Sequence, residues 1–504
     1  MRLTARYTDA LSSEPTVLMN SDDCLKLGVG VNDRVRITST GSVVTTVVIT
    51  DSIVPKGEVM MSPLEMSRCS VRDGEEVDVE YSPMPESIRS VRKKINGHEL
   101  DREEIDSIIS DIMEGNLSEK EIIAFVCAFN VRNATTREIA DLARSMSATG
   151  KRVDLGKGPL YDFHSLGGIP GNKITPIVVS IVASEGLRIP KLSSRAISSA
   201  CGTSDYVETF CDVEFGTEAL KRIVEEANGL FACGNDEYAP VGSRIIEAER
   251  PMGIDPRPMM IASIMSKKIS LGITHLLIDI PMGKDTKVKD ISTAREFASD
   301  FIKAGKELGI HVECAVTDAC QPLGRCIGPI LEARECISAL EGNTADDAVI
   351  QKACGMAGAI LEMSGMPDGY ERACDSLSSG RAHETFVRIV KAQEGRSDIR
   401  SSDLMPAKAF KEIHAKRDGY IQYIDNECMV AIAKGAGAPF DAGAGVELLH
   451  KVGDRVSEGD ALFRIYADNQ TKLERSVSTA RSRRPMLVSD EAVVCSDRMI
   501  IERL

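Results

Sequence analysis

The sequence predicts a multidomain α/β protein, with a helical domain and a large mixed or parallel α/β sheet domain at its centre. Three observations support this prediction. The chain has 504 residues, which is too long for one hydrophobic core. Strand-like and helix-like segments alternate through its middle, as in proteins with a parallel sheet covered by helices. Its first part is rich in β-branched runs separated by turns, which indicates an additional β-rich domain.

Changes in pattern along the chain predict four domains. They are an N-terminal β-rich domain over residues 1–84, a helical domain over 85–150, an α/β catalytic domain over 151–409 and a C-terminal α+β domain over 410–504. We expect later helices to complete the helical domain. Within it, Ser118 and Thr135 are each followed three residues later by a glutamate, which is typical of a helix capping box.

The third domain contains a clear strand–helix–strand pattern. The apolar run THLLIDI at 274–280 precedes a helical pattern over 292–309, and HVECAVTD follows at 311–318. Such a unit places its two strands in parallel, and ligands in parallel sheets lie at the carboxyl ends of the strands. The loops that follow the strands are therefore where we look for a site.

Composition excludes several classes of function. A net charge of -15 argues against a general nucleic-acid binder. The N-terminus lacks the apolar segment of a signal peptide, and the longest apolar run is too short to cross a bilayer. The 14 cysteines form no CxxC pair, so we expect reduced thiols, a cytoplasmic protein, no metal and no cofactor.

A glycine-rich loop before an apolar helix is the first candidate site, over residues 161–186. Thr175 suits the N-cap of this helix and Pro176 its first position. Free backbone N–H groups and the helix dipole favour an anion there, and glycines allow it to approach. The stretch is neither a Walker loop nor a dinucleotide fingerprint. A purely structural turn is the alternative.

The second candidate, SSRAISSACGTSD at 193–205, combines hydroxyls with an arginine and a glycine. Arg195 beside these hydroxyls suits phosphate oxygens, because charge-assisted hydrogen bonds are strong and directional. The alternative is a polar loop in which Thr203 only caps a helix.

Two further stretches carry isolated charges. In 253–268, Asp255 precedes a helical pattern on which Ser263 and Lys267 share a face. In 279–289, three lysines follow a strand, where an anion could be captured, although solvated lysines are the commoner explanation. These lysines are Lys284, Lys287 and Lys289.

Together these stretches resemble the thymidine phosphorylase family. The motif S-G-R-G/A-L-x-x-x-G-G-T-x-D is similar to residues 193–205, and D-K-H-S-x-G-G is similar to DFHSLGG at 162–168. The family's ASIMSKK helix is present intact at 262–268. The resemblance covers about residues 85–504, and GGIPGNK and SSRAI are closest to an archaeal branch that acts on AMP. That branch also carries an extra N-terminal β-rich domain.

The resemblance implies that AMP and inorganic phosphate are the substrates, that adenine and ribose 1,5-bisphosphate are the products, and that the protein is a homodimer or a higher homo-oligomer. It assigns the proton donor to Asp255. The implied AMP-binding residues are Gly168, Ser194, Arg195, Ala196, Ile197, Ser198, Ser199, Thr203, Ser263 and Lys287. The implied phosphate-binding residues are His164, Ser165, Ser193, Lys173 and Lys267.

One position departs from the family pattern. Phe163 stands where thymidine phosphorylases have a lysine that contacts phosphate. Phosphate binding must then depend on hydroxyls, backbone N–H groups and Lys173. Three alternatives stay open: a pyrimidine nucleoside phosphorylase, a phosphoribosyltransferase of related architecture, and an AMP-binding sensor without catalysis. CMP and UMP are possible additional substrates.

Overall fold

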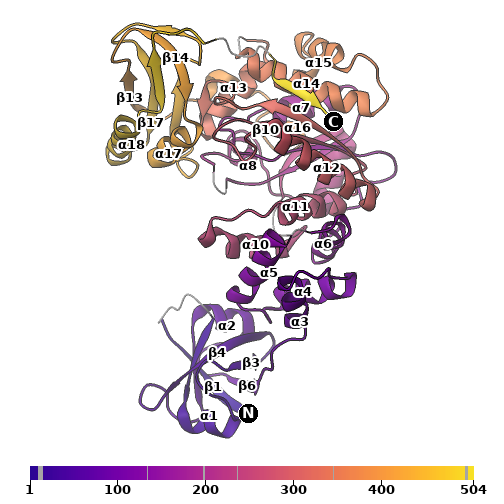
Figure 1. Ribbon diagram of the computed structural model, residues 1–504, viewed down its shortest axis with the longest axis vertical. Coiled ribbons are helices and arrows are strands. Elements are labelled where there is room, and N and C mark those ends of the chain that lie inside the picture. Colours follow the sequence, from indigo (N-terminus) through magenta and orange to yellow (C-terminus); the bar gives the residue numbers. More distant parts are fainter. Residues whose placement is uncertain (10–14, 133, 197–198, 235–236, 344–345, 494–497) are drawn as a thin grey trace. The chain divides into compact units, whose positions relative to one another are not determined.

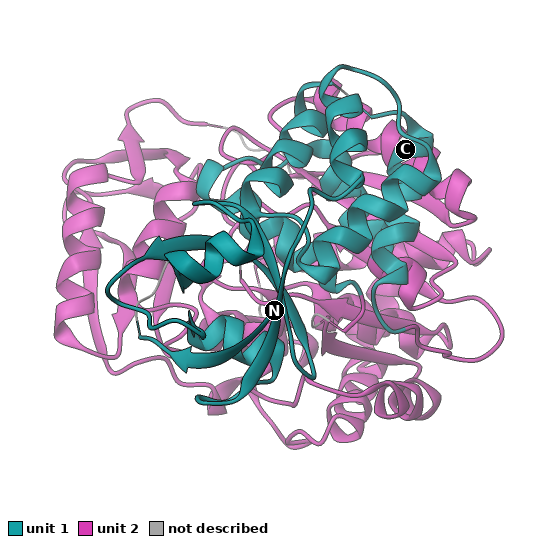
Figure 2. Ribbon diagram, turned by 90° about the horizontal axis from the view of Figure 1, so that it is seen from below, with its two compact units in different colours: residues 1–151, 239–266 teal, residues 152–238, 267–504 magenta. Residues whose placement is uncertain are grey.

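The computed structural model describes residues 1–504 except 10–14, 133, 197–198, 235–236, 344–345 and 494–497. The chain forms two compact units, coloured separately in Figure 2. Unit 1 comprises residues 1–151 and 239–266, and unit 2 comprises residues 152–238 and 267–504. Each unit therefore combines two separate stretches of the sequence.

A closed barrel forms the N-terminal part of unit 1 (Figure 1). Its strands are hydrogen-bonded in the order β1-β5-β2-β4-β3-β6, and β6 closes the barrel against β1 in antiparallel register. Alternate side chains such as Val35 and Ile37 are buried, as a pleated strand requires. The elements are β1 (Arg2–Tyr7), β2 (Thr16–Asn20), α1 (Ser21–Leu27), β3 (Arg34–Thr38), β4 (Ser42–Thr50), β5 (Glu58–Met61), α2 (Pro63–Cys69) and β6 (Glu76–Tyr81).

Helices form the rest of unit 1. They are α3 (Ser87–Ile95), α4 (Arg102–Glu114), α5 (Glu119–Val131), α6 (Thr136–Ala148), α10 (Pro240–Glu249) and the first part of α11 (Arg257–Ser270). The capping boxes predicted at Ser118 and Thr135 are both present. Glu138 of the second box also forms an ion pair with the buried Lys94 of α3, at 2.7 Å. One carboxylate thus caps α6 and joins it to α3.

Unit 2 contains a four-stranded sheet in the order β19-β11-β10-β7. Strands β7, β10 and β11 are parallel, and β19 pairs antiparallel with β11. A separate parallel pair joins β8 to β9. The strands are β7 (Tyr161–Ser165), β8 (Ile189–Ser193), β9 (Gly229–Cys233), β10 (His275–Met282), β11 (His311–Asp318) and β19 (Ile500–Arg503). The helices are α7 (Thr175–Ser184), α8 (Thr203–Val207), α9 (Thr217–Ala227), α12 (Ile291–Leu308), α13 (Pro329–Leu340), α14 (Asp347–Met363), α15 (Gly369–Ser378) and α16 (Arg381–Ala392).

The last part of unit 2 has two antiparallel sheets, in the orders β12-β15-β17-β13 and β16-β14-β18. The strands are β12 (Cys326–Ile327), β13 (Ala409–His414), β14 (Gly419–Ile424), β15 (Gly445–Leu448), β16 (Arg455–Val456), β17 (Ala461–Ala467) and β18 (Met486–Ser489). Helices α17 (Asn426–Ala436) and α18 (Gln470–Arg483) pack with these strands around a common apolar core.

The predicted fold class is confirmed, including the β10–α12–β11 unit with its parallel strands. Two predicted helix caps are wrong. Helix α7 begins at Thr175, so Ile174 occupies the N-cap position and no side chain caps the helix. Gly202 is the N-cap of α8, and Asp205 accepts its N–H, so the Thr203 hydroxyl is not needed there. No helix within the described residues could span a bilayer.

Candidate active site

A cavity of about 270 Å³ lies in unit 2 where β7 and β8 end. Ser165 and Ser193, the last residues of these two strands, both line it. The loops after each strand and the start of α7 complete the wall. The two strands belong to different sheets, but both end at this cavity, so the loops that follow them meet here.

The loop between β7 and α7 approaches the 283–288 loop closely. Gly168 has φ +91°, and a β-carbon there would lie 3.2 Å from the backbone nitrogen of Lys287. The Ser165 hydroxyl accepts hydrogen bonds from the Gly167 N–H at 3.3 Å and from the Asn172 amide at 3.2 Å. Glycine is therefore required at 168 both for conformation and for space.

Asp205 shapes the loop between β8 and α8. Its carboxylate accepts the backbone N–H groups of Ala196 and Gly202, each at 2.8 Å. A β-carbon at Gly202 would lie 2.5 Å from the nitrogen of Ala196, so the two ends of the loop are in contact. Residues 197 and 198, both predicted to bind AMP, lie outside the described residues.

Several polar atoms of this cavity are buried without a protein partner. Within the described residues, the hydroxyl of Ser193, the Nδ1 atom of His164 and the Oδ1 atom of Asn172 make no hydrogen bond. Buried polar atoms in folded proteins are nearly always paired with protein or solvent. Three such atoms on the wall of one cavity fit a polar ligand that supplies the missing bonds.

Lys191 supplies a cation where Phe163 does not. Its ammonium lies 5.2 Å from the centre of the Phe163 ring, 3.6 Å from the Asp162 carboxylate and 3.0 Å from the Leu192 carbonyl oxygen. Burial, opposed by Asp162, lowers the pKa of Lys191 to about 7. Because Asp162 is also paired with Lys268 at 2.5 Å, its negative charge is shared between two lysines. One carboxylate therefore faces two lysines, and it cannot neutralise both.

His164 is held neutral. Burial, and after it the positive charges of nearby lysines, keeps the pKa of His164 well below its usual value. These lysines are Lys268, Lys191, Lys267 and Lys287. A neutral imidazole offers one donor and one acceptor, so His164 can orient a ligand without adding charge.

The structure brings most of the predicted site residues together. His164, Ser165, Gly168, Ser193, Ser194, Arg195, Ser199, Thr203 and Lys287 all line the cavity. Ala196 contributes its N–H to Asp205 instead, and Lys267 acts on the cavity through its charge. Asp255 and Ser263 belong to unit 1, where Asp255 is exposed before α11 and Ser263 lies on that helix.

Lys173 does not line the cavity. It is fully buried, with its ammonium 2.7 Å from Glu335 and 2.7 Å from the carbonyl oxygen of Leu323. Burial lowers the pKa of Lys173, but the charges of Glu335 and Glu332 outweigh that effect and raise it. The residue is a cation that is already neutralised, which makes it a poor ligand for phosphate.

Arg195 lines the cavity but is engaged elsewhere. Its guanidinium pairs with Glu208 at 2.5 Å and with Glu214 at 2.9 Å, and these hydrogen bonds raise its pKa. Two carboxylates therefore compete with any anion for this side chain.

Sequence reasoning missed Lys191, Asn172 and Glu332, which also line the cavity. The only sign of Lys191 in the sequence was its position, two residues before the predicted phosphate-binding Ser193. Burial raises the pKa of Glu332 to about 7, so the carboxyl group is partly protonated near neutral pH.

Three family models match the chain in order. They are the helical bundle domain of a glycosyl transferase family over residues 89–150, the a/b domain of that family over 157–383, and the pyrimidine nucleoside phosphorylase C-terminal domain over 420–486. Together they define a glycosyltransferase enzyme.

Relatives extend the likeness over almost the whole chain. The AMP phosphorylase of Thermococcus kodakarensis is 41% identical, covering 97% of this chain and 98% of its own length. AMP phosphorylase 1 of Archaeoglobus fulgidus is 40% identical over 94% of each chain, and the AMP phosphorylase of Methanococcoides burtonii is 38% identical over 100% and 99%. The chain belongs to the AMP phosphorylase family.

A solved structure supports the fold independently. Anthranilate phosphoribosyltransferase from Thermus thermophilus matches with a TM-score of 0.51 at 20% identity, covering 61% of this chain and 99% of its own. At this identity the match shows the fold alone.

Proposed function

We propose that this protein cleaves AMP with inorganic phosphate to give adenine and ribose 1,5-bisphosphate. The relatives' names support this substrate. The observation that carries the proposal is the cavity at the ends of β7 and β8, where unpartnered polar atoms and the cations Lys191 and Lys287 meet. Such a wall is suited to phosphate oxygens.

In the reaction, a phosphate oxygen attacks C1′ of the ribose while the bond from C1′ to the base nitrogen breaks. The electron pair of that bond passes to adenine. Positive character develops on the sugar and negative charge on the base, as in glycoside cleavage. Phosphate is itself the nucleophile, so the protein contributes positioning and charge stabilisation.

We assign the proton that neutralises the leaving adenine to Asp255, as the family resemblance implies. Asp255 precedes α11, which carries Ser263 as a proposed AMP contact. Protonation at N7 lets the base leave as a neutral molecule, which general acid catalysis favours by about 10²–10⁴-fold.

Phosphate is bound, in this proposal, by Ser165, Ser193, Thr203 and Lys191, with His164 as a neutral hydrogen-bonding group. Lys191 thus takes the part of the cation that Phe163 lacks. Gly168, Ser194, Ser199 and Lys287 contact AMP. The assignment differs from the sequence prediction in three ways. Lys191 replaces Lys173, Thr203 moves from AMP to phosphate, and Lys267 and Arg195 are left out.

The compartment and the assembly are part of the same proposal. All the described cysteines are free thiols, which suits a reducing cytoplasm. We further propose a homodimer or a higher homo-oligomer, and CMP and UMP as additional substrates. The helical, α/β and C-terminal domains form the phosphorylase core, preceded by the barrel.

The experiment is a base-release assay with AMP and with thymidine, each with and without inorganic phosphate. We expect phosphate-dependent adenine release from AMP, strongly reduced in Asp255→Asn. Asp398→Asn is the matched control, because Asp398 is 83% exposed and pairs only loosely with Arg396 at 3.7 Å. Release from thymidine but not from AMP would return the protein to nucleoside phosphorolysis. Binding of AMP without any turnover would favour the sensor.

A further inference from the structure

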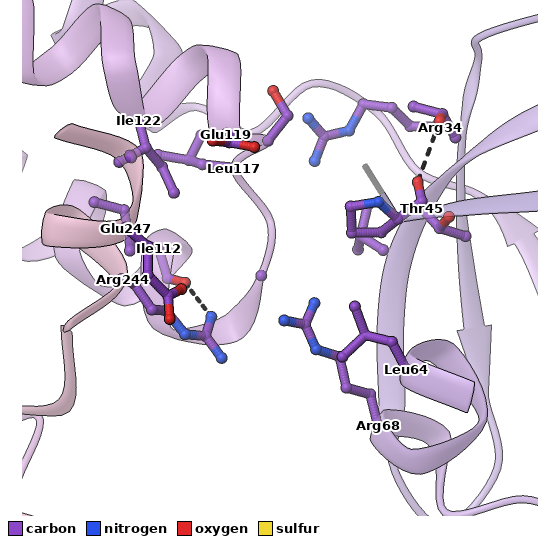
Figure 3. Close-up of a pocket in the computed structure, with 16 residues that line it drawn as sticks. Arg34, Thr45, Leu64, Arg68, Ile112, Leu117, Glu119, Ile122, Arg244 and Glu247 are labelled. Carbon is purple, nitrogen blue, oxygen red and sulfur yellow. Dashed lines mark hydrogen bonds between the residues drawn. The ribbon is translucent and has the colours of Figure 1, made fainter. Parts of the chain in front are cut away.

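A second cavity, of about 300 Å³, lies inside unit 1 between the barrel and the helices (Figure 3). Strands β3 and β4 and helix α2 line it from the barrel. The turn at 115–118, helix α5 and helix α10 line it from the other side. It shares no residue with the cavity of unit 2.

Three arginines from three different elements reach this cavity: Arg34 from β3, Arg68 from α2 and Arg244 from α10. Figure 3 shows the guanidinium groups of Arg68 and Arg244 directed toward each other across the space. An adjoining cavity of about 450 Å³ is lined by the same two arginines and by Arg36. Positive charge is therefore concentrated along this boundary.

These arginines are incompletely neutralised. Arg34 pairs with Glu121 at 3.1 Å and donates to the carbonyl oxygen of Asn116. Arg244 donates to the carbonyl oxygen of Ile112 at 2.5 Å. In the part of the chain that the structure describes, the Arg68 guanidinium makes no hydrogen bond and no ion pair.

Burial lowers the pKa of Arg244, and the charge of Arg68 lowers it further, while Glu247 raises it. Glu247 and Glu119 are the carboxylates on the cavity wall, against three guanidinium groups. Like charges held side by side favour an anion between them.

An unpaired hydroxyl points to the same conclusion independently. Thr45 of β4 is only 3% exposed and lines the cavity, and its Oγ1 atom has no hydrogen-bond partner among the described residues. The Nε atom of Arg34 is likewise buried and unpaired. Buried donors of this kind are normally satisfied, by protein, water or ligand.

We propose that this cavity binds a phosphate group, as inorganic phosphate or as a small phosphate monoester, at a site distinct from the reaction cavity. The planar forks of Arg68 and Arg244 suit phosphate oxygens, and Thr45 and Arg34 supply further donors. The volume is that of a small-molecule site, and a chain with net charge -15 is not suited to a polyanion such as nucleic acid. A bound anion joins the barrel to the helices.

The test uses a tryptophan reporter in the full-length chain, because the natural sequence has no tryptophan. Leu64 of α2 lines the cavity and is 48% exposed, so Leu64→Trp places a single fluorophore at the site. Inorganic phosphate, AMP and ribose 5-phosphate are titrated at constant ionic strength, with sodium chloride as the blank. We expect a saturable signal, weakened about tenfold or more by Arg68→Gln and by Arg244→Gln.

The matched control is Arg72→Gln, which removes an exposed arginine of the barrel that does not line the cavity. Equal affinity for all three probes identifies the phosphate group as the whole ligand, and tighter binding of AMP identifies a nucleotide. Lys191→Met, which alters the reaction cavity, should leave the signal unchanged. No saturation up to about 10 mM, or a response that Lys191→Met abolishes and Arg68→Gln does not, overturns the proposal.

Hydrogen exchange provides a second measurement without the reporter. Phosphate should slow exchange in peptides covering residues 62–71 and 240–250 of the unmodified chain, and Arg68→Gln should remove that protection. Protection restricted to residues 161–205 would mean that phosphate binds only in the reaction cavity. Since that outcome leaves turnover intact, it is distinguishable from failure of the proposed reaction.

Discussion

The buried lysines of unit 2 and the cavity arginine of unit 1 differ in how their charges are balanced. In unit 2, buried lysines are matched with buried carboxylates: Lys173 with Glu335 at 2.7 Å, Lys352 with Asp279 at 2.9 Å and Lys268 with Asp162 at 2.5 Å. In unit 1, Arg68 reaches its cavity with no carboxylate partner among the described residues.

The difference separates two uses of a positive charge. A buried cation with its own carboxylate maintains the fold, because removing either partner leaves an uncompensated charge. A cation that shares its carboxylate, like Lys191, or has none, like Arg68, can still gain from an incoming anion. Position in a phosphate-like loop alone does not distinguish the two.

The largest expected effect tests a buried lysine that has its own carboxylate partner. Lys173→Met leaves Glu335 buried without its cation, so we expect unit 2 to be destabilised by about 3–5 kcal/mol. Thermal unfolding followed by circular dichroism measures this, and Lys391→Met, at an exposed position of α16, is the control. An unchanged unfolding temperature together with a weaker affinity for phosphate would make Lys173 a ligand and break the comparison.

The next effect tests Lys191, the lysine that shares its carboxylate with another lysine. Lys191→Met should raise the KM for phosphate by about 10–100-fold, since a charge-assisted hydrogen bond contributes about 1.5–3 kcal/mol. We expect no loss of stability, because Asp162 keeps Lys268. Steady-state kinetics at fixed AMP measures the change. Lys157→Met, at an exposed position, should leave the KM as it is.

The pH dependence of phosphate binding sharpens the same point. Lys191 has a pKa of about 7, so it carries its charge below that pH and loses it above. The affinity for phosphate should therefore fall as pH rises through 7, by up to about tenfold per unit. Steady-state kinetics between about pH 6 and pH 9, a range that includes this pKa, measures the change in affinity. Lys191→Arg remains charged over this range, so the affinity for phosphate should fall less steeply in that variant. An equally steep fall would mean that another group titrates.

The smallest effect concerns Arg195, the cavity arginine that already has partners. Arg195→Gln should change the KM for AMP by less than about threefold, because Glu208 and Glu214 occupy the guanidinium and exposed ion pairs contribute little. AMP titration kinetics checks this. A rise of tenfold or more, roughly the value of a charged hydrogen bond, would restore Arg195 as a substrate ligand.

Much of the fold could be predicted because local signals agreed with it. The capping glutamates of α5 and α6 and the apolar runs of β10 and β11 were visible directly. Strands β1, β2 and β5 of the barrel were missed. Parallel pairing, such as that of β1 with β5 and of β2 with β4, leaves no hairpin pattern in the sequence.

The site was predicted less completely, for a physical reason. Hydroxyls and glycines in the loops after β7 and β8 were recognisable as phosphate-binding groups. Whether a lysine faces the ligand or a carboxylate depends on long-range neighbours: Glu335 for Lys173 and Asp162 for Lys191. Spacing along the chain contains no information on such pairs.

The interleaving of the two units constrains the order in which they can form during synthesis. The barrel uses residues 2–81 and can close as soon as that stretch has left the ribosome. The helices of unit 1 must wait for α10, by which time β7 has emerged without its partner strand β10. For that interval the nascent chain carries a finished barrel and two unfinished cores, and exposed apolar surface on such intermediates is where chaperones act.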